Sequence, residues 1–125
     1  MTSRCIALAL ALSIGSPLLA QDLKAGMTAG SADLKSAGAL AFAPEGILLV
    51  ADPIGGAIFA VDTGDAAGSP DAVKHNVPGL DQKIAAALGV KSGDLLVNDL
   101  VVNPASGNLY LSVSPGRGPD ALPVL

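Results

Sequence analysis

The chain has 125 residues and a formal net charge of −4, with 7 Lys and Arg against 11 Asp and Glu. Its length suits one small domain. The lysines are scattered singly, which argues against nucleic-acid binding because phosphate contacts need clustered basic side chains. Aromatic residues make up only 2% of the sequence, so a protein-binding hot spot built on large aromatic anchors is not expected.

Residues 1–20 have the layout of a secretory signal peptide. Arg4 supplies the positive charge, Cys5–Ile14 is a continuous apolar run, Pro17 interrupts it, and Ala20 is a small residue at the expected cleavage site. The run is shorter than the roughly 20 apolar residues that a membrane-spanning helix needs. We therefore expect a signal helix and export to the periplasm or the extracellular space, with no membrane attachment after cleavage.

Residues 21–36 are rich in Ala, Gly and Ser without a sustained period, and they predict an extended N-terminal arm. Residues 37–79 predict a first unit of short antiparallel strands joined by tight turns that contain Pro and Gly. The expected strands are residues 37–43, 47–51, 57–61 and, as a polar outer edge, 72–77.

Residues 80–96 predict a helical insertion. Asp81 is the expected N-cap, residues 82–88 form the helix, and Gly89 suits the position just past the helix end. Residues 97–125 return to a strand pattern and close on the start of a third strand, so they predict a second, incomplete unit.

The second unit repeats the first. Leu40–Pro44 aligns with Leu100–Pro104, which begins 60 positions later. The following strands align as well, and the Pro and Gly turn at residues 52–56 aligns with that at 114–118. Self-similarity on this scale is typical of a repeat architecture.

The two copies resemble blades of a β-propeller of the NHL-repeat or gluconolactonase-like, six-bladed type. Each copy is an apolar strand that ends at Pro, a turn with Gly, and a second apolar strand, as in Leu40–Val50 and Leu100–Leu111. The spacing of 60 residues exceeds the usual blade of roughly 40–50, and the absence of Trp fits the WD-repeat branch badly.

This resemblance implies an all-β fold of antiparallel four-stranded blades around a central channel, with one short inserted helix. About one and a half blades are present, whereas closure typically takes about 4–8. We therefore expect the N-terminal piece of a longer propeller. The other architecture that the sequence allows is a small β domain of two sheets.

Asn98 and Asp99 are the candidate metal ligands. They open the first strand of the second unit, and in the gluconolactonase-like branch Asn, Asp and Glu at such positions, contributed by several blades, bind a divalent cation. Calcium is one such ion, and oxygen ligands suit it. The same two side chains can instead cap a strand by hydrogen bonding to backbone groups, which is the interpretation we favour.

Other polar residues give weaker signals. Asp62–Asp65 is expected to be a turn, because it lacks the closing Glu of a calcium loop. His75, the only histidine, is expected to be solvated on an outer strand. Arg117 and Asp120 are expected to form a polar surface contact, as an ion pair or as solvated groups. No catalytic triad, phosphate loop or dinucleotide-binding motif is present, so no cofactor is evident.

The sequence therefore favours an exported β-propeller fragment with a binding or scaffolding role toward an unknown small molecule or protein. One alternative is the N-terminal part of a metal-dependent, lactone-hydrolysing enzyme, with further ligands on other blades. Another is a non-functional remnant. Whether the chain takes part in catalysis is left open by its sequence.

Overall fold

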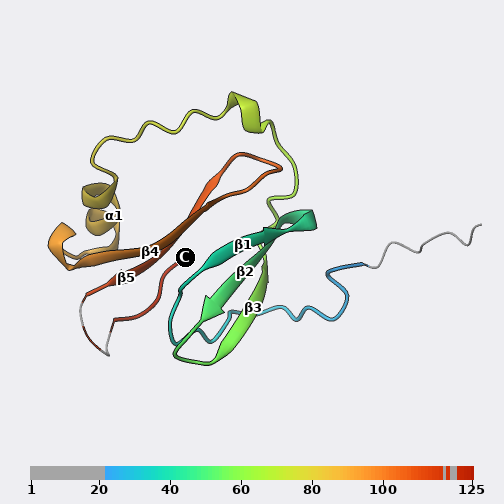
Figure 1. Ribbon diagram of the computed structural model, residues 1–125, viewed down its shortest axis with the longest axis horizontal. Helices are drawn as coiled ribbons and strands as arrows, with labels where there is room; N and C mark the ends of the chain where they lie inside the picture. The colour runs from blue at the N-terminus through green and yellow to red at the C-terminus, as the bar shows by residue number, and fades with distance from the viewer. Residues whose placement is uncertain (1–21, 117, 119–120) are drawn as a thin grey trace, which may run out of the picture.

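The computed structural model describes residues 22–116, 118 and 121–125, which form two small antiparallel sheets and one α-helix (Figure 1). The first sheet has the strand order β1-β2-β3, and the second pairs β4 with β5. The elements are β1 (Leu40–Ala43), β2 (Ile47–Asp52), β3 (Ala57–Asp62), α1 (Leu80–Leu88), β4 (Leu95–Val102) and β5 (Leu109–Pro115).

The first sheet is the meander that its Pro and Gly turns predict. β1 and β2 are joined by a 3-10 turn at Pro44–Gly46, where Glu45 and Gly46 have φ values of 63° and 73°. Gly46 is required there on two counts: its φ favours glycine, and an added Cβ would lie 2.7 Å from the Asp65 carbonyl oxygen. The close approach of the two turns therefore depends on a residue without a side chain.

The fourth strand expected at residues 72–77 is wrong. The structure has a 3-10 turn at Pro70–Ala72, followed by chain outside any strand or helix as far as Gly79. Every residue from 66 to 79 is exposed. The segment connects the first sheet to α1 (Figure 1) and passes close to the β4–β5 connection at Ser106 and Gly107. The first sheet therefore has three strands, and β3 lies at its edge.

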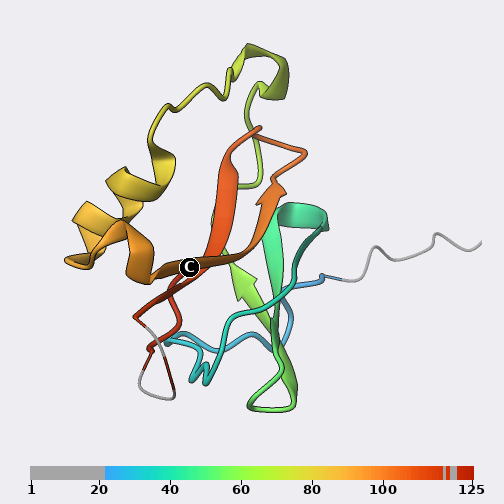
Figure 2. The same ribbon diagram turned by 60° about the vertical axis from the view of Figure 1, so that its left-hand side comes forward.

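The predicted helix is confirmed, with an earlier start. α1 begins at Leu80 after Gly79, which takes a left-handed conformation, and Asp81 lies in the first turn instead of at the N-cap. Gly89 ends the helix with a φ of 71°, as its position predicts. Figure 2 shows α1 beside the second sheet, with the long connection from the first sheet above it.

The second sheet is a single hairpin with an irregularity in β4. The register shifts between Val97 and Asp99, which is a β-bulge. Near the chain's end, Val124 makes an antiparallel bridge with Val113, with N···O distances of 2.9 and 3.0 Å. The start of a third strand, expected within residues 121–125, is thus reduced to one bridge.

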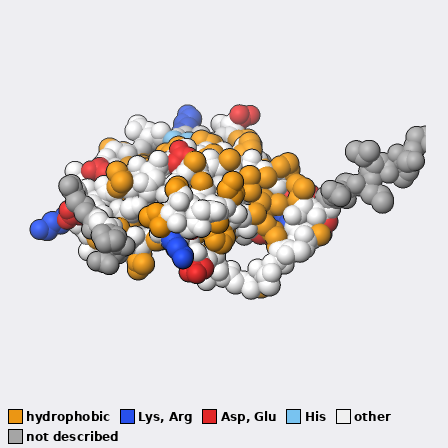
Figure 3. All heavy atoms as spheres, turned by 60° about the horizontal axis from the view of Figure 1, so that its bottom comes forward, with side chains coloured by type: hydrophobic (Ala, Val, Ile, Leu, Met, Phe, Trp, Pro, Cys, Tyr) orange, Lys and Arg blue, Asp and Glu red, His pale blue; other side chains and the backbone are white. Residues whose placement is uncertain are grey.

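The core lies between the two sheets and is small. Its buried members are Ala37, Leu40, Leu48 and Val50, all from the first sheet and the segment that leads into it. Phe42 and Tyr110 close it from opposite sheets, with an edge-to-face ring contact at 5.0 Å between centroids. Hydrophobic side chains also reach the surface across the molecule (Figure 3).

The expected signal helix at residues 1–20 lies outside the described part of the chain. Among residues 22–116, 118 and 121–125, no helix combines the length and the apolar character needed to span a bilayer.

Leu48→Ala is expected to lower the free energy of unfolding by about 2–5 kcal/mol, because it opens a cavity in a core that has few other large side chains. Chemical denaturation measures the change. Ile58→Thr is the matched control on the same sheet, since Ile58 is 75% exposed, and it should change stability by about 0.5 kcal/mol or less. Equal losses for the two variants would contradict the described core.

Candidate functional site

Asp99 lies where β4 meets the open edge of β1. Its Oδ2 accepts the Leu40 N–H at 2.7 Å, and its Oδ1 accepts the Leu100 N–H at 2.8 Å. Leu40 lies opposite Val50 of β2, but its N–H points away from that strand, because backbone groups alternate in direction and the Ala39 carbonyl is the one that accepts from β2, at the Ala51 N–H. The carboxylate therefore takes the place of a neighbouring strand at this edge.

Two more side chains of the second sheet hold the same segment. Asn98 Nδ2 donates to the Ala37 carbonyl and to Ser114 Oγ, both at 2.9 Å, and Ser112 Oγ donates to the Gly38 carbonyl at 2.7 Å. Successive residues of a regular strand point to opposite faces. The bulge in β4 removes that alternation locally, so Asn98 and Asp99 both reach the first sheet.

The electrostatics of Asp99 fit this structural role. The Leu40 N–H, and after it the Leu100 N–H, lower the pKa of the Asp99 carboxyl below its usual value, since both bonds favour the charged form. The side-chain-to-backbone bonding that the sequence favoured at these two positions is therefore present.

The described residues around Asn98 and Asp99 fall short of a calcium site. Calcium takes about 6–8 oxygen ligands, and within the described ranges no three His, Cys, Asp or Glu side chains come together as a possible metal site. A cation here would depend on oxygens from elsewhere. The metal assignment of Asn98 and Asp99 remains a prediction.

Asp65 is the most heavily bonded carboxylate between the sheets, and sequence reasoning did not single it out. Its Oδ2 accepts hydrogen bonds from Ser106 Oγ at 2.6 Å, Asn103 Nδ2 at 2.9 Å, Asn108 Nδ2 at 3.1 Å and the Tyr110 hydroxyl at 3.1 Å. The Ser106 hydroxyl is the main cause of a lowered pKa at Asp65. Burial, in turn, raises the pKa of Tyr110.

The turn that carries Asp65 is the one predicted for residues 62–65. Asp62 Oδ1 accepts the Gly64 N–H at 3.0 Å, and Gly64 has a φ of 69°. In the sequence, this cluster could have been predicted only from the polar residues of the β4–β5 connection. Their shared acceptor, Asp65, lies 38 to 45 positions away in sequence, so a local pattern cannot identify it.

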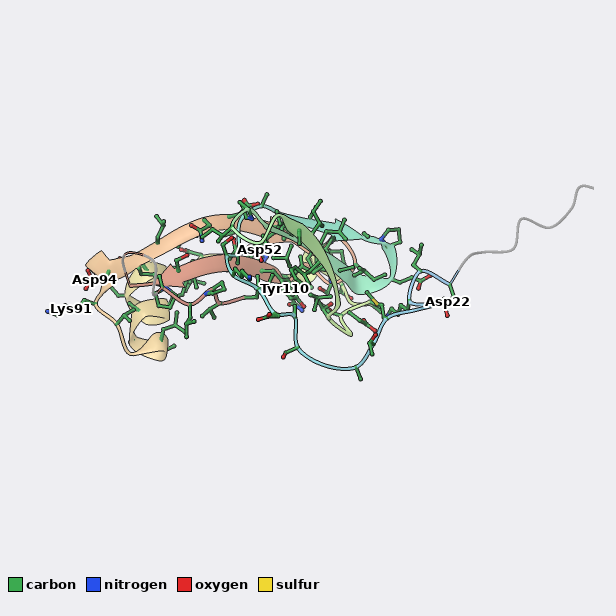
Figure 4. The ribbon with its side chains drawn as sticks, turned by 90° about the horizontal axis from the view of Figure 1, so that it is seen from below. Asp22, Asp52, Lys91, Asp94 and Tyr110 are labelled. Atoms are coloured by element: carbon green, nitrogen blue, oxygen red, sulfur yellow. The ribbon has the colours of Figure 1, made fainter. Side chains whose placement is uncertain are left out.

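Asp52 fastens the N-terminal arm to the end of β2 (Figure 4). This side chain is only 1% exposed. Its Oδ1 accepts from Ser36 Oγ at 2.7 Å, the Ser36 N–H at 2.9 Å and the Gly55 N–H at 2.8 Å, and its Oδ2 accepts from the Lys35 N–H at 2.9 Å. The Ser36 hydroxyl, with the three amides, lowers the pKa of Asp52 to about 2.

The remaining polar candidates do not join these clusters. His75 is exposed and lies on the connecting segment instead of a strand, with Nε2 donating to the Gly107 carbonyl at 2.7 Å. Arg117 and Asp120 lie outside the described residues, so their proposed surface contact remains a prediction. What the described geometry provides is a set of aspartates that bind the protein's own amides and hydroxyls.

Comparisons with protein-family models, with curated proteins and with solved structures found no match to this chain. The described residues form a mostly β structure of two antiparallel sheets with one α-helix. The propeller interpretation rests on the internal repeat.

Asp52 is expected to make stability depend on acid pH. Its folded pKa of about 2 lies below the value of about 3.9 for an unfolded Asp. Its contribution is therefore fully present above about pH 4, and is lost as the pH falls toward about 2. Asp52→Asn should have a lower free energy of unfolding than wild type at pH 7, and this free energy should fall less on acidification. Urea unfolding at several pH values measures both effects.

Asp71→Asn is the control, because Asp71 lies on an exposed turn, and its stability should depend on pH as that of wild type does. A wild-type pH dependence for Asp52→Asn would contradict the role assigned to this carboxylate.

Asp99→Ala is expected to lower the melting temperature by the same amount with and without calcium, because it leaves the Leu40 N–H without its acceptor. Thermal melts of both proteins, each with calcium or with a chelator, measure this. Asp99→Asn keeps one oxygen acceptor and should lose less than Asp99→Ala. A calcium-dependent rise in wild type that Asp99→Ala abolishes would instead support the metal role.

Proposed function

We propose that this chain belongs to an exported β-propeller and acts as a binding or scaffolding module. Export is inferred from the signal-peptide pattern of residues 1–20. The propeller is inferred from the two copies of the strand–turn–strand pattern in the sequence. The alternative role is a metal-dependent, lactone-hydrolysing enzyme, in which Asn98 and Asp99 would be joined by ligands from other blades.

The arrangement of the two hairpins supports the repeat. Leu40 and Leu100, which align in sequence, lie in β1 and β4, each the first strand of an antiparallel hairpin. In both copies the first strand is followed by a Pro turn and a second apolar strand. The hairpins also lie side by side, joined through Asp99 and Asn98, as consecutive repeats of one architecture do.

The observation that carries the proposal is an uncovered apolar face on the second sheet. Val101 and Tyr110 face the first sheet and pack against its core. By the alternation of the strand, Leu100 and Val102 face the other way, and Val97 shares their side through its pairing with Val113. We call Val97, Leu100 and Val102 the outer patch; their exposed fractions are 44%, 46% and 45%.

α1 covers only the β5 side of this face. A groove of about 400 Å³ runs between them, lined by Ile84, Ala87 and Leu88 from the helix and by Leu109, Leu111 and Val113 from the strand. Contiguous exposed apolar surface marks an interaction site. In a propeller the face of one blade packs on the next, so this surface is where a further blade, or a partner with the same kind of apolar face, would lie.

The outer patch is expected to make the chain self-associate in solution, since burial of half-exposed Leu and Val side chains contributes about 1 kcal/mol each. Sedimentation velocity over a concentration series measures this. Leu100→Lys combined with Val102→Thr should shift the chain to monomer without lowering its melting temperature.

Ile58→Thr is the matched control, because it removes an exposed apolar side chain from the other sheet, and it should associate like wild type. A wild-type chain that stays monomeric at high concentration and binds no hydrophobic dye would overturn the scaffolding role of this face.

A further inference from the structure

β3 has an open edge along its whole length. Thr63, which follows the strand, donates its N–H to the Gly46 carbonyl at 3.1 Å on the β2 side. Backbone groups of a strand alternate in direction, so Ile58, Ala60 and Asp62 point their N–H and C=O groups away from β2. Within the described residues these groups have no backbone partner. An edge of this kind is a template for another strand.

The N-terminal arm passes along this edge and is fastened at both ends. At one end, Lys24 Nζ pairs with Asp62 Oδ1 at 2.8 Å. At the other end, Asp52 accepts the amides of Lys35 and Ser36. The arm therefore runs antiparallel to β3, from its last residue toward its first.

Between these two attachments the arm stands away from the strand. A cleft of about 450 Å³ separates residues 27–33 of the arm from residues 59–62 of β3. In Figure 3 the arm forms a loop that projects from the body of the molecule. Gly26 and Gly30 have φ values of 91° and 154°. The arm therefore does not follow a strand path at these two glycines, and its middle part makes no ladder with β3.

We propose that this cleft is a peptide-binding site in which an extended segment adds to β3 as a fourth strand, beneath the arm. The edge groups from Ile58 to Asp62 span four residue steps, about 14 Å, which matches about five residues of an extended peptide. Main-chain hydrogen bonds supply the affinity in this mode of recognition, and alternate side chains supply the selectivity.

The lining of the cleft defines the chemistry of the peptide. Two carboxylates, Asp33 and Asp62, line it together with small and apolar residues. Lys24 is paired with Asp62, so the carboxylate of the lining without an ion pair among the described residues is Asp33. The site therefore favours a peptide with a cationic residue between small or β-branched ones. This inference specifies the ligand of the binding role proposed above and rests on that role.

The experiment titrates the full chain, isotopically labelled for amide NMR, with the capped peptide acetyl-Thr-Val-Lys-Val-Thr-amide. Saturable shifts are expected at the amides of Ile58, Ala60 and Asp62 and along the arm. The same peptide with Glu in place of Lys should bind more weakly, because it places a like charge beside Asp33.

Two N-methylated forms of the peptide test the strand geometry without changing the protein. Each carries its methyl groups on alternate residues, so that one form loses the N–H groups that face β3 and the other loses those that face away. The first should lose binding, with about a tenfold drop in affinity for each bond removed, and the second should keep it.

Ala60→Pro and Ala60→Thr form a matched pair in the protein. Proline removes the outward N–H and is tolerated on an edge strand, so it should abolish binding while the melting temperature shows the chain still folded. Threonine keeps the N–H and suits a strand, so it should bind like wild type.

Absence of saturable shifts at millimolar peptide, equal binding of both N-methylated forms, or shifts confined to the α1–β5 groove would each overturn the inference. Leu100→Lys with Val102→Thr should leave peptide binding unchanged. A chain that self-associates through the outer patch but ignores the peptide would overturn this site alone and leave the scaffolding role standing.

Discussion

Side-chain hydrogen bonds to aspartates hold the two sheets together, and the Asp65 carboxylate makes the largest set of them. The two sheets share no strand ladder, so their arrangement depends on such side-chain bonds and on the packing of the small core between them. Asp65 follows the last strand of the first sheet and accepts bonds from four side chains of the second hairpin and its connection. Several donors converging on one charged acceptor are stronger than neutral bonds, and they compensate for a core with few large apolar groups.

Asp52 and Asp99 apply the same chemistry at two other places. Asp99 satisfies the edge of β1, and Asp52 holds the arm against the end of β2. Asp has a short side chain, so little conformational entropy is lost when it is fixed, and it tolerates turn and strand-end positions. The ten-to-one excess of Asp over Glu in this chain thus has a structural meaning: these three carboxylates serve as acceptors for backbone and hydroxyl groups.

Two surfaces remain open, and they differ in chemistry. The outer patch is apolar and broad, which suits another packed face, whereas the cleft beside β3 offers unpaired backbone groups and carboxylates, which suit an extended strand. Residues 66–79 form no strand beside β3, and α1 lies against β5 and not against β4. These two surfaces are the ones on which the proposed binding role rests.

The sequence by itself determined the local elements. Pro44–Gly46 and Asp62–Asp65 became turns, and Gly89 ended the helix, because Pro and Gly act through their own φ preferences and need no distant partner. It also indicated that Asn98 and Asp99 bond to backbone groups. Only the tertiary structure decided which groups these are, that a bulge aims both side chains at one sheet, and that residues 72–77 stay out of any sheet. These outcomes depend on contacts between segments 40 to 60 residues apart and on what a strand could bury, and neither is encoded in the local pattern.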